Sequence, residues 1–280
     1  MWFDMPPPPP PQIVQAECTR LYSELVRAPS RDVMAAHQRA ESSGGDRENI
    51  NDQFMRQRRE AIEEEARALG AQAGLAWRTQ RIQTALENPD IRSVANRVFD
   101  FNRVMSEQSI LLPVISEANE AFESSSDGQQ ARKSQTTWEI IEPARIVLSP
   151  MTWQEYLFLV YEERPTRAPA GLMPYNRAEE LMWQQGLCAG FENGVIQGDL
   201  IFQDNLIELV RDYTGMLRFR MLAAQGIVSM PEVYEGRLGV TINGERLHVD
   251  DRLIQITAPV RFQDVERWQP AVSLDRPERR

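Results

Sequence analysis

The side chains of this sequence that could take part in catalysis are few. Its 280 residues include two histidines, His37 and His248. His248 follows a predicted hairpin turn and stands beside Asp250-Asp251, and a histidine next to a carboxylate is a familiar acid–base arrangement. However, His248 alternates with apolar neighbours, which places it on the solvent-facing side of a strand. An enzyme that uses His248 therefore remains an alternative and is not our prediction.

Other kinds of reactive site find no support in the sequence. Ser229 and Thr241 have no nearby base, so a nucleophilic site is not indicated. We interpret Asp127-Gly128 and Asp250-Asp251 as turn residues in preference to metal ligands. The chain has no GxxxxGK[ST] or GxGxxG motif and no Cys/His cluster with metal-ligand spacing. We predict no catalytic residue, no cofactor and no metal site.

The two cysteines, Cys18 and Cys188, lie 170 residues apart. A disulfide between them stays open. The sequence favours two unpaired cysteines, because Cys18 falls in a segment that looks unstructured and Cys188 is expected to be a small core residue.

Composition narrows the class of protein. The net charge of −10 disfavours a nucleic-acid-binding surface. Lys133 is the only lysine, so almost all positive charge is arginine. Genome composition explains this, and a role for arginine in interfaces is the alternative.

The sequence contains no run of 18 apolar residues, which is the length that a membrane-spanning helix would need. As written, the N-terminus shows no signal peptide, which predicts the cytoplasm or a chain numbered from a processed or truncated start.

The remaining sequence must be explained by elements that pack, and the segment from Asn176 to Gly226 is central. It contains four glycines at a strict spacing of four: Gly186, Gly190, Gly194 and Gly198. In a helix, successive members of this set drift by roughly 40°, so together they form a groove along one face. Each glycine costs roughly 0.8–1.0 kcal/mol relative to alanine, so a close neighbour must lie in the groove.

A second helix offers a matching face. Gly70 and Gly74 repeat the spacing of four within a predicted helix from Gln53 to Glu87, where Trp77 follows on the apolar side. We expect the two helices to pack on each other through these faces. Further along the central helix, Gly215 lies in its C-terminal part, and Gly226 is expected to end the helix. Between the glycine ladder and that end, apolar residues recur at a coiled-coil spacing: Phe202, Leu206, Leu209, Tyr213 and Met216.

The chain is predicted to be α+β, with long helices packed on a small antiparallel sheet. Residues 1–52 are a proline-rich tail, interpreted as disordered or, alternatively, as a segment that orders on a partner. Residues 53–270 form the folded domain and 271–280 a charged tail. The C-terminal part carries a hairpin that turns at Asn243-Gly244 and a third strand from Leu253 to Val260. Thr152 and Asn176 are expected to cap helices.

One series of segments resembles the DotC family of Dot/Icm-type (type IVB) secretion systems and IncI-type conjugation machinery. The first is Gly-Ala-Gln-Ala-Gly-Leu-Ala-Trp-Arg at 70–78. Others follow in family order: Asp100–Asn102, Ile110–Val114, Ser126–Gln129, Thr152-Trp153 with Tyr156-Leu157, Gly215–Arg220, Gln225–Pro231, Leu238–Thr241 and Arg252–Ala258. Met151 stands where the family usually has proline. The resemblance covers roughly residues 65–270.

The resemblance implies a non-enzymatic role in the bacterial envelope. Members of this family are lipoproteins that help to build the outer-membrane core complex, a ring assembly with DotD-like and DotH-like partners, and they support the DotH-like subunit. It also implies a periplasmic, outer-membrane-associated protein without direct nucleic-acid binding. The beginning of the chain departs from the family, because Ala16-Glu17 before Cys18 does not match a lipidation site. A free periplasmic adaptor or peptidoglycan-binding module is the alternative function.

Overall fold

The computed structural model describes residues 7–26, 48–106, 109–124, 131–158 and 169–268. The chain divides into two compact units. The first comprises Met1–Ala95 and Leu157–Asn205, and the second Asn96–Tyr156 and Leu206–Arg280. Helices dominate, and the described strands form three separate two-stranded antiparallel sheets. The predicted α+β class, with long helices packed on small antiparallel sheets, is confirmed.

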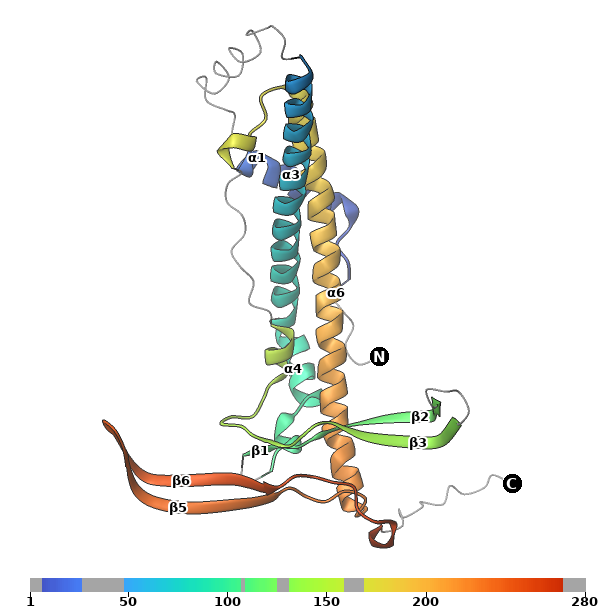
Figure 1. Cartoon of the computed structure of the whole chain (residues 1–280), viewed down its shortest axis with the longest axis vertical. Helices are drawn as coiled ribbons and strands as arrows, with labels where there is room; N and C mark the ends of the chain where they lie inside the picture. Colours follow the sequence, from blue (N-terminus) through green and yellow to red (C-terminus); the bar gives the residue numbers. More distant parts are fainter. Residues whose placement is uncertain (1–6, 27–47, 107–108, 125–130, 159–168, 269–280) are drawn as a thin grey trace. The chain divides into compact units, whose positions relative to one another are not determined.

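Two long helices form the framework of the first unit (Figure 1). They are α3 (Glu48–Leu86) and the first part of α6 (Arg177–Ala224), and a shorter helix, α1 (Pro11–Leu25), lies against them together with the turn η2 (Ala170–Leu172). The core of this unit draws on all three helices: Cys18, Leu21, Leu25, Ile62, Ala66, Leu69, Ala73, Trp77, Trp183, Leu187, Phe191 and Val195.

Glycines of α3 and α6 lie against each other's backbone. A Cβ placed on Gly70 would come within 3.0 Å of the Phe191 backbone nitrogen. In return, a Cβ on Gly190 would collide with the carbonyl of Arg67. Gly74 and Gly194 repeat this arrangement against Phe191 and Ala71. The two helices are therefore in backbone contact, which explains why the sequence accepts four glycines within one helix.

The start of α6 is fixed by two sets of polar contacts. The Asn176 carboxamide accepts a hydrogen bond from the Glu179 amide at 2.9 Å, and the Glu179 carboxylate accepts one from the Tyr175 amide at 2.9 Å. Glu179 is 2% exposed and pairs with Arg58 of α3 at 3.1 Å. Arg58 also donates to the carbonyls of Gly171 and Met173. The predicted cap at Asn176 is confirmed, and the buried carboxylate has a full set of partners.

A disulfide joins Cys18 of α1 to Cys188 of α6, with the two Cα atoms 5.3 Å apart. The sequence favours an unpaired Cys188, and this interpretation is wrong. The reason is that α1 is amphipathic and buries Leu21 and Leu25 on the same side as Cys18. Residues 11–25, which the sequence assigns to the N-terminal tail, thus form a helix that is tied to the core.

The second unit contains the strands and the remainder of α6. Its elements in chain order are the end of α4 (Pro89–Val98), η1 (Phe101–Val104), β1 (Ile110–Leu111), β2 (Val114–Ser124), β3 (Ala131–Glu142), β4 (Arg145–Ile146), α5 (Trp153–Leu157), β5 (Glu232–Asn243), β6 (Arg246–Ala258) and η3 (Val265–Arg267). β1 pairs with β4, β2 with β3 and β5 with β6. The Thr152 cap is confirmed, because the Glu155 carboxylate accepts hydrogen bonds from the Thr152 amide and hydroxyl.

The C-terminal hairpin differs from its prediction. The segment from Leu253 to Val260 is not a third strand, because its residues up to Ala258 continue β6 and pair with the first half of β5. Bulges around Gly239, which has a φ of +69°, shift the register in the middle of the ribbon. A bulge changes the phase of the apolar alternation, so one long strand gives the sequence pattern of two.

In the second unit, α6 packs through the predicted apolar seam. Leu209, Tyr213 and Met216 are buried. The Tyr213 ring lies edge-on to Phe99 and Phe101, with centroid distances of 5.5 Å to each. Gly215 allows β2 to approach, because a Cβ at this position would collide with the Val114 side chain. α6 therefore uses glycine contacts in the first unit and mainly large side chains in the second.

We predict that Gly190→Ala destabilises the protein by about 1–3 kcal/mol, since the new methyl group would meet the backbone of Arg67, which cannot rotate away. The gain in helix propensity of about 1 kcal/mol offsets only part of this cost. Chemical denaturation measures the loss. Gly171→Ala is the control, because nothing lies within 4 Å of a Cβ there. Equal stability of the two variants would contradict the close packing.

Candidate interaction surfaces

No constellation for catalysis is found in the part of the chain that the structure describes. Within those residues, no group of three His, Cys, Asp or Glu side chains could hold a metal ion. His248 lies in β6 opposite Thr241 in the register, and its side chain is outside the described residues, as is all of His37. The Ser229 hydroxyl accepts a hydrogen bond from the Arg261 amide at 3.1 Å, so it has a structural partner.

The β5–β6 hairpin presents apolar side chains to solvent. We call residues 232–258 the hairpin ribbon (Figure 1). Five of its large apolar residues are between 45% and 69% exposed: Tyr234, Val240, Leu247, Val249 and Leu253. Among the described residues, no third strand is hydrogen-bonded to either long edge of this two-stranded sheet, although β4 comes close to β6. The ribbon therefore combines open backbone edges with exposed apolar surface.

Three of these side chains lie on one face near the turn. Val240 of β5 is paired directly with Val249 of β6, and paired residues share a face. Leu247 stands two residues before Val249 and so points to the same side. Their exposed fractions are 62%, 69% and 62% for Val240, Val249 and Leu247. This arrangement forms a continuous apolar patch at the end of the ribbon.

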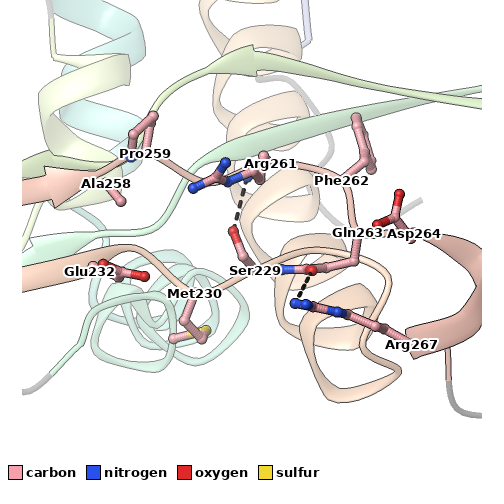
Figure 2. Close-up of a pocket in the computed structure, with 10 residues that line it drawn as sticks. All are labelled: Ser229, Met230, Glu232, Ala258, Pro259, Arg261, Phe262, Gln263, Asp264 and Arg267. Atoms are coloured by element: carbon pink, nitrogen blue, oxygen red, sulfur yellow. Dashed lines mark hydrogen bonds between the residues drawn. The ribbon is translucent and has the colours of Figure 1, made fainter.

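A pocket of about 500 Å³ lies at the base of the ribbon (Figure 2). The chain entering β5 and the chain leaving β6 form a short ladder there, with Ser229 N donating to Arg261 O at 2.9 Å and Gln263 N donating to Ile227 O at 2.8 Å. The lining residues are Ser229, Met230, Glu232, Ala258, Pro259, Arg261, Phe262, Gln263, Asp264 and Arg267.

The lining of this pocket mixes charged and apolar side chains. It has two acidic and two arginine side chains, and Met230 and Phe262 are 55% and 42% exposed. Arg267 donates to the Gln263 carboxamide at 2.9 Å, which fixes one of the charges (Figure 2). Mixed charges beside apolar groups are typical of the rim of an interface. Ser229-Met230 and Ala258 also belong to two of the segments that carry the family resemblance.

A second pocket, of about 410 Å³, is lined by two other such segments, Asp100–Asn102 and Thr152-Trp153. The Trp153 indole is 2% exposed and donates to Asn96 at 2.7 Å. Nearby, the Tyr156 hydroxyl donates to the buried carboxylate of Asp212 at 3.1 Å, which connects α5 to α6. Burial, followed by the negative charge of Asp212, raises the pKa of Tyr156 far above its ordinary value of 10.0. These contacts anchor α5 on α6.

The residues predicted for packing fall into two groups. Gly70, Gly74, Gly186, Gly190, Gly194 and Gly198 all lie where α3 meets α6. Trp77 is 7% exposed and packs on Phe191, with ring centroids 5.7 Å apart. Gly215 lies apart from these, against β2, and Gly226 adopts a φ of +70° just after α6. The sequence does not identify the pocket at the base of the ribbon, whose residues share no recognisable spacing.

Comparison with known proteins identifies a family to which this chain is similar. A family model described as T4SS_TraI, "Type IV secretory system, conjugal DNA-protein transfer", matches residues 21–270. A search of curated proteins finds no match. In the described part of the chain, none of the helices has the length and apolar character needed to cross a membrane.

We expect Tyr156→Phe to change the alkaline stability of the protein. A folded-state pKa above the ordinary value means stability that is complete below about pH 10 and is lost as the pH rises beyond it. Removal of this hydroxyl reduces that pH dependence by up to about 1.4 kcal/mol per pH unit, and costs about 1 kcal/mol at neutral pH. Urea denaturation across the alkaline range measures both effects. The exposed Tyr234→Phe is the matched control, and the same slope in both variants would contradict the assignment.

Proposed function

This chain belongs to the type IV secretory system family of conjugal DNA–protein transfer, and we propose that it is a non-enzymatic structural subunit of the outer-membrane core complex. Its partners are DotD-like and DotH-like subunits, and several copies occupy a ring in which the chain supports assembly of the DotH-like subunit. Membership of the family is established; the place in the core complex is our proposal, and it rests on the DotC-like segments.

The structural observation that supports a role in assembly is the hairpin ribbon. A two-stranded hairpin alone is at most marginally stable in water, and this one leaves five large apolar residues exposed. Such a ribbon is stabilised when another chain adds a strand to its edge or covers its apolar face. Catalysis by itself has no need for a surface of this kind, whereas a structural subunit of a large complex does. The purification described below separates a core-complex subunit from a free adaptor.

The disulfide supports a location outside the cytoplasm. Disulfides persist in the bacterial periplasm and are rare where thiols are kept reduced. The Cys18–Cys188 bond joins two elements of the core and is shielded, because Cys18 is only 1% exposed. We therefore propose that the protein works in the periplasm, in association with the outer membrane.

The main test uses affinity purification of the tagged chain from detergent-extracted envelopes. We expect wild-type protein to elute in a large particle with DotD-like and DotH-like subunits. Leu247→Asp should reduce their recovery at least about tenfold, because a charge would be placed in the covered apolar patch. Its own stability should change by less than about 0.5 kcal/mol, since Leu247 is 62% exposed.

The control is Leu148→Asp, the same substitution at a fully exposed leucine outside the ribbon. It should leave the particle intact. Recovery of the wild-type chain alone would reject the structural role and favour the free periplasmic adaptor or peptidoglycan-binding module. Equal effects of the two substitutions would reject the ribbon as the contact surface.

The location is tested by thiol alkylation in intact cells. We expect Cys18 and Cys188 to resist alkylation until a reductant is added, since both are oxidised in the mature protein. Cys18→Ser with Cys188→Ser should lower the stability of purified protein by about 2–5 kcal/mol, because the bond links cysteines 170 residues apart. Free thiols in growing cells would place the protein in the cytoplasm.

A further inference from the structure

A third pocket, of about 390 Å³, lies in the first unit beside the disulfide. We call it the proline pocket, because the proline run that leads into α1 forms one of its walls and α6 another. Pro8 and Pro9 line it from the proline run, and Ala189, Glu192 and Ile196 line it from α6. The proposed place in the core complex gives this pocket no role.

The walls of the proline pocket are held in place by the chain itself. The Cys18–Cys188 disulfide ties α1 to α6, and both cysteines line the pocket. The Pro7 carbonyl accepts a hydrogen bond from the Arg78 guanidinium at 3.3 Å, and the Arg78 side chain is 3% exposed. Pro10 has a φ of −55° and a ψ of 140°, the polyproline II conformation. The pocket is therefore preformed, as binding sites usually are.

The proline run offers hydrogen-bond acceptors without donors. Proline has no backbone N–H, and the carbonyls of Pro8 and Pro9 accept no hydrogen bond from a described residue. Pro8 is exposed and Pro9 is half-buried, so both can be reached. Segments in the polyproline II conformation are recognised by aromatic side chains. Among these, tryptophan also carries an N–H that can donate to a carbonyl.

α6 adds an apolar surface to the same pocket. Ile196 is 51% exposed, and Leu200, which follows one turn later, is 54% exposed. No described side chain covers either of them fully. The apolar surface therefore continues beyond the pocket along α6, so it can accommodate a segment that is longer than one side chain.

The uncompensated charge of the proline pocket is negative. Its charged lining residues are Glu192 and Asp199. Asp199 is neutralised by Arg78 at 2.6 Å, whereas Glu192 is exposed and forms no ion pair with another described residue. On α1, Arg20 is paired with Glu17 at 2.8 Å, so it adds no free positive charge. A positive charge on the bound segment is complementary to this surface.

We propose that the proline pocket binds an extended segment of a partner protein through a tryptophan that is followed by a basic residue. The indole lies against the proline run and donates its N–H to a carbonyl of Pro8 or Pro9. The ring also packs on Ile196, and the basic side chain pairs with Glu192. None of these residues belongs to the hairpin ribbon, so the inference does not depend on the proposed place in the core complex.

The first experiment titrates the purified full-length, disulfide-bonded chain with the peptide Ac-Trp-Arg-NH2 and follows methyl NMR signals. We expect saturable shifts at Val195 and Ile196. Ac-Trp-Glu-NH2 should bind about three- to tenfold more weakly, because its carboxylate meets the carboxylate of Glu192. Glu192→Gln should remove this difference between the peptides, and Glu64→Gln, at an exposed carboxylate of α3 outside the pocket, should preserve it. No saturation below about 20 mM, or an unchanged difference in Glu192→Gln, would overturn the proposal.

A second pair of variants tests the apolar wall. Ile196→Ser should weaken the binding of Ac-Trp-Arg-NH2 at least about threefold, measured at the Val195 methyl signals, because the ring loses apolar contact. Ile207→Ser is the matched control: Ile207 is an α6 isoleucine outside the pocket, 59% exposed against 51% for Ile196. Equal effects of the two substitutions would reject the contact with α6.

The last variant separates a partner from the chain itself, whose own Trp2 precedes the proline run in the sequence. We expect Trp2→Ala in the full-length chain to leave the affinity for Ac-Trp-Arg-NH2 unchanged. A gain of at least about tenfold would show that Trp2 competes for the pocket. That result would make this chain the source of the tryptophan and overturn the partner.

Discussion

The contact between the backbones of α3 and α6 is the constraint on which the first unit depends. Gly70 and Gly74 of α3 meet Leu187 and Phe191 of α6, and Gly190 of α6 meets Arg67 in return. Because both helices contribute glycine, neither has a ridge that would keep the other away. The approach also brings buried polar groups within reach. Arg78 passes over Gly198, where its Cβ and Cγ occupy the space that a side chain would need, and pairs with Asp199 at 2.6 Å.

Features that depend on local spacing could be predicted from the sequence. The glycine spacing of four by itself indicates a close helix contact, since an unpartnered ladder would cost stability without compensation. The caps at Thr152 and Asn176 follow from a side chain that can satisfy a free amide three residues away. The apolar seam through Leu209, Tyr213 and Met216 follows from its period. In each case, the cause and the signal lie within one turn or one helix.

Features that depend on distant partners could not be predicted in the same way. The partner of Cys18 lies 170 residues away, and α1 is weakly amphipathic with a proline-rich start, so its docking on α6 leaves little trace in the sequence. The sequence pattern divides the hairpin ribbon wrongly because bulges near Gly239 invert the apolar alternation. The pocket below the ribbon is formed by two segments that meet beside the Val228–Phe262 bridge.

The sparse chemistry and the abundant exposed apolar surface have one physical explanation. Apolar groups exposed singly are ordinary, whereas continuous ones favour association because burying them releases hydrating water. Here they are continuous across the end of the ribbon, where Val240, Leu247 and Val249 share one face. The described polar side chains serve mainly as helix caps and ion pairs, while the ribbon exposes an apolar face, and this combination is what our proposal of an assembly subunit explains.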